Sequence, residues 1–454
     1  MNTLIPPPLK ELASAISRPL YVVGGSVRDF LAGYSATLTD WDICSPASET
    51  EVETAAEQCG FHVNAVYRNT GTVKLTDRDG TGYEFTRFRS DKYMRGLHTP
   101  AEIEFTDDIG RDARRRDFCA NAVYYDIAAD KFCDPLGGME DIREKKLRTV
   151  APAKKVFGED GLRLVRLARL AAQTGFAPDE ECLAGAKENC SLICDIAPER
   201  IFSELDQLLL SDKKAGGAWG PWRGLHILRD TGVLAQIMPE LALGDGMAQR
   251  ADFHNYDVLE HSFRCVYYAP ASIRWAALLH DVGKPFCYLR DGNFHAHPEE
   301  GARIAADILS RLKAPKKLTE RVASLVLLHM RDFDLRMKEG KVRREIVRVH
   351  DLLPDLFALR QADFSACKDD VSPAPGVVKW QNILAQMRAE GVPFSVKGLA
   401  VTGNDLTARG IRGERIGKML EELLSYCTQD GARNTREHLL KHLDRITKEK
   451  KETL

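Results

Sequence analysis

The sequence lacks a long hydrophobic run, a secretory start and a regular cysteine pattern. No apolar stretch approaches the roughly 20 residues that a membrane-spanning helix requires, and the opening residues Met1–Pro8 lack the basic and then apolar order of a signal peptide. The 11 cysteines show no repeated spacing, which argues against a disulfide framework and predicts a reducing compartment. We therefore expect a cytoplasmic protein with no membrane partner.

The net charge is also small, because the chain has 64 Lys and Arg residues and 66 Asp and Glu residues. Bulk attraction to nucleic acid is not expected, so an RNA partner would need locally concentrated cations. The run Arg111–Arg116 is one such cluster. A second, from Lys441 to Lys451, is interspersed with acids and favours a solvated helix face. At 454 residues the chain should form two to four domains.

A glycine turn follows the first predicted strand. The apolar run Leu20–Val23 predicts a buried strand, and it ends in Gly24 and Gly25, which allow the backbone to approach a ligand closely. Ser26 then begins a predicted helix whose free N–H groups suit a phosphate. The alternative is that these glycines only form a turn between two secondary-structure elements.

Two carboxylates follow at strand spacing. Asp40 and Asp42 alternate with Trp41 and Ile43, so a strand there points both carboxylates to one face. Two carboxylates beside a phosphate site suit Mg²⁺ that bridges a triphosphate and an attacking hydroxyl. An Asp pair that caps a turn at the strand edge is the structural alternative.

Arginines are concentrated in two later segments. Three adjacent arginines, Arg114–Arg116, repel one another unless anions lie among them; Asp117 supplies one, and a triphosphate would supply the rest. The second segment, Glu159–Arg169, predicts a helix with a charged residue at every third position. The alternative for both segments is a solvated face, in the second case with a chain of salt bridges. The regularly spaced charged residues of the second segment are Asp160, Arg163, Arg166 and Arg169.

An aspartate beside an arginine could read nucleotide bases. Cytosine and adenine each place an amino donor beside a ring-nitrogen acceptor, which a carboxylate and a guanidinium complement. Uracil and guanine would present like groups instead, and each mispaired buried group costs about 1–3 kcal/mol. A pair made by Asp160 and Arg163 could therefore select C and A without a nucleic-acid template.

These motifs resemble the class II branch of the nucleotidyltransferase superfamily that includes DNA polymerase beta, namely the tRNA CCA-adding enzymes and bacterial poly(A) polymerases. The matching motifs are Gly-Gly-Ser-Val-Arg-Asp, Arg-Arg-Asp-Phe-Cys-Ala-Asn-Ala with Cys119 where Thr is usual, Glu-Asp-Gly-Leu-Arg, and a bracing element at Pro198–Leu205. The resemblance implies that Asp40 and Asp42 bind Mg²⁺ and that Glu84, on a neighbouring strand, is a third catalytic carboxylate. Alternatively, Glu84 could be a structural partner of Arg87 or Arg89. The nucleotide-binding residues implied are Gly24, Gly25, Ser26, Arg28, Arg116, Asp117, Asn121, Asp160, Arg163, Arg166 and Arg169.

A second chemical site is indicated by His280–Asp281 on an apolar segment. This pair resembles the HD phosphohydrolase superfamily, which implies a divalent ion held by His261, His280, Asp281 and Asp363. Nitrogen and oxygen ligands together suit a transition metal or Mg²⁺. The resemblance also places His295, His297 and His329 near the site, although any single histidine could be structural.

The expected fold is an α/β nucleotidyltransferase head with a mixed sheet and helices, followed by all-α neck, HD and tail domains. The expected boundaries are 1–150 for the head, 151–248 for the base-reading and neck domain, 249–370 for the HD domain and 371–454 for a tail that contacts tRNA. The polar stretch Ser90–Asp108 predicts a mobile loop.

The activity implied is template-independent addition of CCA to tRNA 3′ ends from CTP and ATP, with release of pyrophosphate. Hydrolysis of phosphoesters by the HD domain is a further activity that the resemblance implies. The alternatives are a poly(A) polymerase, an enzyme that adds only CC or only A, and an HD phosphohydrolase whose head merely binds RNA. The sequence leaves the oligomeric state open.

Overall fold

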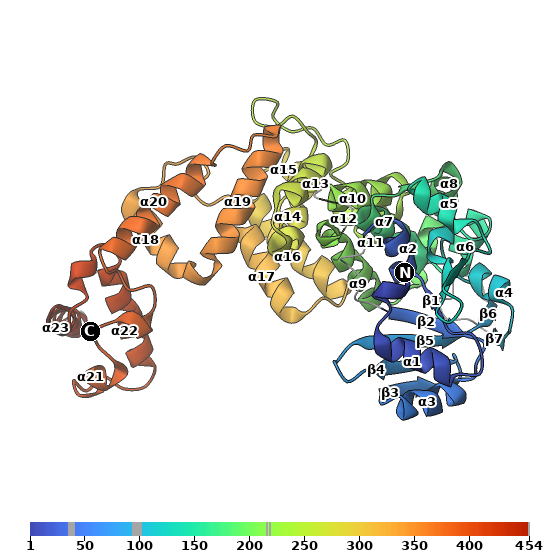
Figure 1. The fold of residues 1–454 in the computed structure, drawn as a ribbon. Coiled ribbons are helices and arrows are strands. Elements are labelled where there is room, and N and C mark those ends of the chain that lie inside the picture. Colours follow the sequence, from blue (N-terminus) through green and yellow to red (C-terminus); the bar gives the residue numbers. More distant parts are fainter. Residues whose placement is uncertain (35–40, 93–101, 215–216, 218, 453–454) are drawn as a thin grey trace. The chain divides into compact units, whose positions relative to one another are not determined.

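The computed structural model describes residues 1–34, 41–92, 102–214, 217 and 219–452 (Figure 1). They divide into two compact units, the first made of 1–245 and 307–316 and the second of 246–306 and 317–454. Within the described ranges, no helix has both the length and the apolar character that crossing a bilayer demands. All 11 cysteines are free thiols.

A seven-stranded mixed sheet begins the first unit, which confirms the α/β head. The strand order is β3-β4-β5-β2-β1-β8-β9, with β2 and β5 parallel and the other neighbours antiparallel. Asp42 lies opposite Val23 on one side and Glu84 on the other. The strands are β1 Tyr21–Val23, β2 Trp41–Ser45, β3 His62–Tyr67, β4 Thr72–Thr76, β5 Gly82–Arg87, β8 Tyr124–Asp126 and β9 Lys131–Cys133.

Short helices cover this sheet. Helix α3 packs on β3 and β4 and against α1, while α2 packs on β1 and against α5. Cys119, which replaces the usual Thr, is fully buried in the core, and its Sγ lies 3.3 Å from the Thr149 carbonyl oxygen, so the small side chain is accommodated. The helices are α1 Pro7–Ala15, α2 Gly25–Leu31, α3 Glu49–Gln58, α4 Ile109–Arg114 and α5 Gly138–Arg143.

The prediction that Ser90–Asp108 is a loop throughout was wrong at its flanks. Strands β6 (Arg89–Lys92) and β7 (Glu102–Phe105) pair antiparallel, and Lys92 bonds Glu102 at 2.9 Å across them. Strand β6 is polar throughout and hides the alternation by which a strand is recognised in sequence, whereas β7 alternates Glu102 and Glu104 with Ile103 and Phe105 and could have been recognised. Residues 93–101 lie outside the described part of the chain.

Helices complete the first unit, with α7 at their centre. Helix α7 packs against α9 and α10, and α6 packs against α8. Strands β10 (Lys146–Leu147) and β11 (Ala177–Pro178) form a short parallel pair. The helices are α6 Ala153–Glu159, α7 Leu162–Thr174, α8 Glu180–Asn189, α9 Pro198–Leu209, α10 Gly220–Asp230, α11 Val233–Ile237 and α12 Pro239–Ala242.

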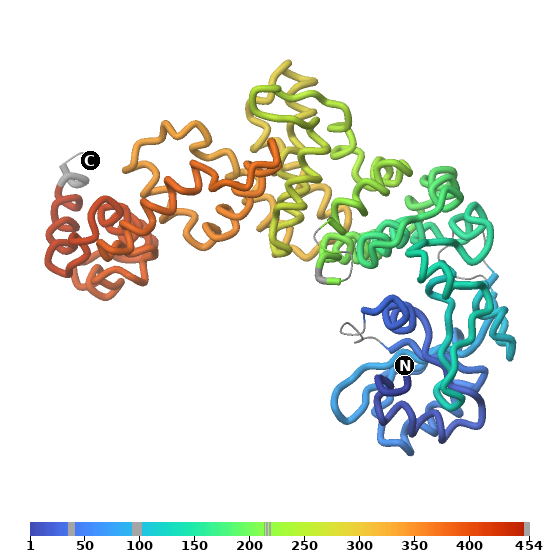
Figure 2. The backbone as a smooth tube through the Cα atoms, turned by 45° about the horizontal axis from the view of Figure 1, so that its top comes forward, coloured from blue at the N-terminus to red at the C-terminus, as the bar shows by residue number. Residues whose placement is uncertain are grey.

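The second unit is helical throughout its described residues. Helix α13 packs against α14 and α19, and the last helices, red in Figure 2, share a small core of their own that includes Leu406, Leu423 and Leu439. Helix α16 begins here and passes into the first unit at Asp307. The helices are α13 Val258–Tyr268, α14 Arg274–Leu279, α15 Lys284–Asp291, α16 His297–Arg311, α17 Lys316–Leu328, α18 Glu339–Arg348, α19 Leu353–Lys368, α20 Pro375–Ala389, α21 Gly403–Thr407, α22 Glu414–Cys427 and α23 Arg436–Glu452.

Candidate functional site

A cavity of about 390 Å³ in the first unit joins the glycine turn, β2, the arginine run and α7. All the nucleotide-binding residues expected from the sequence line it, together with Asp42. Eight cationic side chains face four carboxylates around the lining, so the cavity favours an anion. Lining residues that the sequence reasoning did not single out are Asp29, Leu162, Leu170, Gln173, Arg200, Gln207 and Lys214, while Arg115 belongs to the arginine run.

Asp42 and the glycine turn approach each other closely. Gly24 has a φ of +79°, a conformation that favours glycine, and a Cβ on it would lie 3.0 Å from Oδ2 of Asp42. Helix α2 starts at Gly25, with Ser26 buried in its first turn. The turn therefore needs glycine both for its backbone conformation and for the space that the Asp42 carboxylate occupies.

The other two predicted carboxylates differ from Asp42. Glu84 is the parallel neighbour of Asp42 and is exposed, but it is not among the described residues that line the cavity. Its carboxylate lies 3.5 Å from Lys74, whereas Arg87 and Arg89 make ion pairs with Glu49 and Asp91. The structural partner of Glu84 is thus Lys74. Asp40 lies outside the described residues.

A chain of hydrogen bonds runs through the cavity wall from α2 to α7. Arg28 donates to Asn121 at 2.6 Å, Asn121 donates to Asp117 at 3.1 Å, and Arg166 donates to Asp117 at 2.6 and 2.9 Å. Burial alone would raise the pKa of Asp117, but the charge and hydrogen bonds of Arg166 hold it well below its ordinary value. Asp117 is therefore a permanent anion that orients Arg166 and Asn121.

Helix α9 braces α7 through a carboxylate. Glu204, within the segment expected to brace, accepts from Arg169 at 2.5 Å and lies 3.8 Å from Arg166. Arg169 also donates to Gln173 at 2.8 Å. The guanidinium groups of both arginines are thereby fixed at the cavity wall.

Asp112 is a central residue of the arginine run that the sequence reasoning missed. Its carboxylate is fully buried and lies 2.7 Å from Arg115, 3.3 Å from Arg116 and 2.7 Å from the Tyr124 hydroxyl. A carboxylate three and four residues before two arginines on a helix was the signal that could have found it. Part of the charge that we assigned to a bound triphosphate is therefore balanced by the protein itself.

The helix predicted over Glu159–Arg169 is broken at Asp160. Helix α6 ends at Glu159, Asp160 is extended with φ −143° and ψ 107°, and α7 begins at Leu162, whose N–H donates to Asp160 at 2.9 Å. Arg163 is buried and donates to Glu159 and to the carbonyl oxygens of Val156 and Arg115. The periodic pattern of charges could not reveal this break, because Asp160 ends one helix and its carboxylate accepts from the first N–H of the next.

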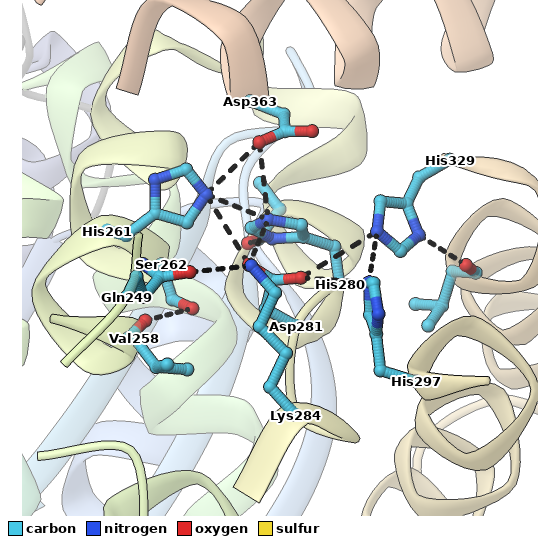
Figure 3. Close-up of polar contacts among 12 residues, drawn as sticks. Gln249, Val258, His261, Ser262, His280, Asp281, Lys284, His297, His329 and Asp363 are labelled. Atoms are coloured by element: carbon cyan, nitrogen blue, oxygen red, sulfur yellow. Dashed lines mark hydrogen bonds and ion pairs between the residues drawn. The ribbon is translucent and has the colours of Figure 1, made fainter. Parts of the chain in front are cut away.

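The second unit brings all four predicted HD residues together (Figure 3). His261 Nε2 on α13 lies 3.2 Å from His280 Nε2 and 3.1 Å from Asp363 Oδ1 on α19, and Asp281 Oδ2 lies 3.2 Å from His280. Lys284 lies 2.6 Å from Asp281 Oδ2. The ligand atoms of His261, His280 and Asp363 form one group that could hold a divalent ion, and Asp281 belongs to a neighbouring group with His297 and His329.

Two further histidines lie on the opposite side of Asp281. His297 and His329 lie 3.4 and 3.7 Å from Asp281 Oδ1, whereas His295 is exposed. Gly283 permits this arrangement, because a Cβ there would lie 2.4 Å from the carbonyl oxygen of His297 at the start of α16. A third group with metal-ligand spacing is His254, His261 and Cys367.

The histidines of this cluster differ in how their environment shifts their pKa. Burial would lower the pKa of His280, but the carboxylates of Asp281 and Asp363 raise it to about 10. Burial lowers the pKa of His297 to about 4, with Asp281 only partly opposing it. His280 thus holds a positive charge beside two carboxylates at neutral pH, while His297 offers a neutral ring.

Three family models match the chain in order. Residues 20–148 match "Poly A polymerase head domain", residues 175–243 match "Probable RNA and SrmB- binding site of polymerase A", and residues 258–354 match "HD domain". The cavity residues before Asp160 fall in the first match, and His261, His280 and Asp281 fall in the third.

Two curated proteins and one solved structure resemble most of the chain. The A-adding tRNA nucleotidyltransferase of Deinococcus radiodurans is 30% identical over 88% of this chain and 90% of its own length. The multifunctional CCA protein of Xanthomonas campestris is 30% identical over 88% of this chain and 96% of its own length. The Bacillus stearothermophilus CCA-adding enzyme in complex with CTP has the same fold, with a TM-score of 0.68 at 23% identity over 99% of this chain and 100% of that one.

Proposed function

This chain belongs to the family of tRNA nucleotidyltransferases, and on that premise we propose that it adds C, C and A to tRNA 3′ ends without a template, from CTP and ATP. The reaction would join the terminal 3′-hydroxyl to the α-phosphorus and release pyrophosphate. Addition of A alone, which the name of the Deinococcus relative describes, is the nearest alternative. Poly(A) synthesis and addition of CC alone are the others.

One observation carries this proposal: Asp42, the arginine run and the Asp160–Arg163 segment line a single cavity. The cationic side chains suit a triphosphate, with Arg28, Arg116, Arg166 and Arg169 on its walls. Asp117 and Asn121, joined by a hydrogen bond, would orient the sugar. The carboxylate of Asp160 and the guanidinium of Arg163 would meet the base and favour C and A, as their hydrogen-bonding pattern predicts.

The residues beside the glycine turn suit Mg²⁺. Asp42 offers an exposed carboxylate at the cavity, Glu84 offers another one strand away, and hard oxygen ligands are those that Mg²⁺ prefers. We propose Asp40 and Asp42 as its ligands and Glu84 as a third catalytic carboxylate. When bound, the ions would activate the 3′-hydroxyl and stabilise the triphosphate charge. The lining arginines would hold the phosphates in line for attack, and Gly24 would leave room for the Asp42 carboxylate.

Incorporation into a tRNA that lacks its last three nucleotides tests the proposal. CTP and ATP supplied together should restore CCA, CTP alone should add two residues, and ATP alone should add none. Addition of one A only to a tRNA that already ends in CC would identify an A-adding enzyme, and a long A tail would identify a poly(A) polymerase. No incorporation under any of these conditions would overturn the proposal.

We propose a hydrolytic site in the second unit as well. His261, His280, Asp281 and Asp363 would hold a divalent transition metal or Mg²⁺, whose chemistry is to polarise a phosphoester and activate water. Lys284, 2.6 Å from Asp281, would bind a substrate phosphate. Release of phosphate from small phosphomonoesters, or opening of cyclic phosphodiesters, would test this activity. Its absence after loading with Mn²⁺, Co²⁺, Ni²⁺ or Mg²⁺ would refute it.

We propose four domains for this chain. They are a head at 1–150, a base-reading and neck domain at 151–248, an HD domain at 249–370 and a tail at 371–454. The tail would contact tRNA, and the reaction would take place in the cytoplasm. Limited proteolysis tests the boundaries, because cleavage should concentrate between domains.

A further inference from the structure

A pocket of about 770 Å³ lies in the second unit, between the end of α17 and the start of α18 (Figure 1). Its lining comes from residues 330–344, so it shares no described residue with the cavity of the first unit or with the histidine cluster around Asp281. We call it the basic pocket, because five exposed cationic side chains line it. They are Arg331, Arg336, Lys338, Lys341 and Arg344.

Most of the positive charge in the basic pocket is unpaired, because the carboxylates of its lining have other partners. Asp332 is buried and lies 2.8 Å from Lys379, which is not part of the lining. Asp334 lies 3.8 Å from Arg336. The other four cations form no ion pair within the part of the chain that the structure describes. These four charges are therefore available to a polyanion.

An aromatic side chain lies among these cations. Phe333 lines the basic pocket and is 67% exposed, although water is a poor environment for its ring. An exposed ring beside cationic side chains is the combination that binds unpaired nucleotides, because the ring stacks on a base while the cations contact phosphates. The composition of the pocket therefore matches single-stranded nucleic acid.

The segment that carries this ring is fixed by α20. Asp332 accepts hydrogen bonds from the Trp380 indole N–H at 3.0 Å and from the Met337 N–H at 2.8 Å. Lys379 donates to the carbonyl oxygens of Leu335 and Met337 at 2.8 and 2.9 Å. These contacts hold the backbone on both sides of the ring, where Asp332 and Leu335 have φ values of +56° and +62°. The ring is thus presented by a preorganised segment, which limits the entropy lost when a ligand binds.

We propose that the basic pocket binds RNA, with Phe333 stacked on an unpaired base and the surrounding arginines and lysines in contact with the adjacent phosphates. The RNA is the tRNA substrate, so this inference rests on the proposed function and deepens it by a contact outside both the cavity and the tail. An acidic protein would match the charge alone. RNA matches both features, because each nucleotide carries a base for the ring and a phosphate for a cation.

The affinity of the full chain for a tRNA that lacks CCA tests this contact. F333A should weaken binding by about 5- to 150-fold, as the loss of one stack between a base and an aromatic ring does. K341Q and R344Q should each reduce the steepness of log affinity against log salt concentration by about 0.7–0.9, because one phosphate fewer is neutralised. Fluorescence anisotropy over a range of KCl concentrations measures both quantities.

Two matched variants control for a general loss of apolar surface or of charge. Phe253 is also exposed and lies beside an arginine, Arg250, but it does not line the basic pocket, so F253A should leave the tRNA affinity unchanged. Arg348 lies on the same helix as Arg344 but pairs with Glu345, so R348Q should hardly change the salt dependence. Circular dichroism of each variant verifies folding.

A blunt RNA duplex separates stacking from charge. It offers phosphates but no unpaired base, so K341Q and R344Q should weaken its binding, whereas F333A should not. An equal loss of tRNA and duplex affinity in F333A would overturn the stacking of Phe333 on a base.

The outcomes separate this inference from the proposed function. A tRNA affinity that is unchanged in F333A, K341Q and R344Q, in a chain that adds CCA, would overturn the inference, leave the proposed function intact and favour an acidic protein as the ligand of the basic pocket. A chain that binds tRNA through Phe333 but adds no nucleotide would sustain the inference and refute the addition of CCA.

Discussion

In the first unit, arginines surround a cavity and outnumber its carboxylates, whereas in the second unit histidines and carboxylates converge in groups that could hold a metal ion. The arginines are held by carboxylates of the protein, as Asp117 holds Arg166 and Glu204 holds Arg169. Three of the histidines, His280, His297 and His329, place Nδ1 within hydrogen-bond distance of a backbone carbonyl oxygen. The first arrangement suits a polyanion such as a triphosphate, and the second suits metal ions.

The two regions also differ in how they depend on pH. Arginines remain charged at every accessible pH, and the pKa of Asp117 is held well below its ordinary value, so the charges of these cavity groups are constant near neutral pH. In the second unit the pKa of His280 is raised to about 10, so a proton occupies that ring until a metal replaces it. Anion binding should therefore be nearly independent of pH, whereas metal binding should release protons and strengthen as pH rises.

The largest expected effect is the loss of one activity, with retention of the other, when a single carboxylate is replaced. D42N should lower nucleotide incorporation by at least about 10³-fold, because loss of a metal-binding carboxylate removes several kcal/mol of transition-state stabilisation. Phosphoester hydrolysis should be unchanged in D42N. D281N should show the opposite pattern, measured in the same two assays. Loss of both activities in either variant would contradict two independent sites.

Removing Asp112 should destabilise the first unit without touching the second. D112A leaves the half-buried Arg115 and Arg116 without their shared carboxylate, which costs about 1–3 kcal/mol. E104A removes an exposed ion pair with Arg111 in the same region and should cost no more than about 1 kcal/mol. Calorimetry of the full chain at neutral pH measures both, and equal costs would contradict a structural role for Asp112.

The pH dependence of the stability lost in D112A serves as a control for this prediction. Burial opposes ionisation of Asp112, but Arg115 and Arg116 lower its pKa below the ordinary value. A depressed folded-state pKa contributes stability that is complete above the unfolded value of about 4 and is lost as pH falls further. The difference between wild type and D112A should therefore be constant from pH 7 to 5 and shrink below pH 4. A difference that shrinks between pH 7 and 5 would implicate another group.

Two glycines provide a matched test of the cavity geometry. Gly24 and Gly33 have φ values of +79° and +81°, so G24A and G33A should each strain the backbone. Only at Gly24 does a Cβ meet the Asp42 carboxylate, while nothing lies within 4 Å at Gly33. G24A should lower kcat for incorporation by about 10²-fold, as small displacements of catalytic groups do. Equal kcat values in the two variants would show that Asp42 tolerates the displacement.

These contrasts also show what sequence could and could not reveal. The glycine turn was predictable because its strand, turn and helix are contiguous, and the mixed α/β head was confirmed. Partners distant in sequence were not predictable, since Arg166 bonds Asp117 across 49 residues and its helical stripe gave no sign of that partner. The break at Asp160 was hidden because both flanking segments are helical. The resemblance to HD proteins predicted that His297 and His329 lie near the HD site. Their contact with Asp281 became known only from the fold.

The smallest expected effect concerns nucleotide choice, and it decides whether Asp160 reads bases or only caps α7. D160N keeps an oxygen that can accept from Leu162 N–H but replaces the other acceptor by a donor. Discrimination of CTP against UTP, measured as the ratio of kcat/KM values, should fall by about 5- to 150-fold, since one mispaired buried group costs about 1–3 kcal/mol. Asp179 is the N-cap of α8 and also accepts from a first-turn N–H, that of Cys182, but it does not line the cavity, so D179N should leave the ratio unchanged. If D160N also leaves it unchanged, the aspartate serves the helix alone, and selection of C and A must come from other groups of the cavity.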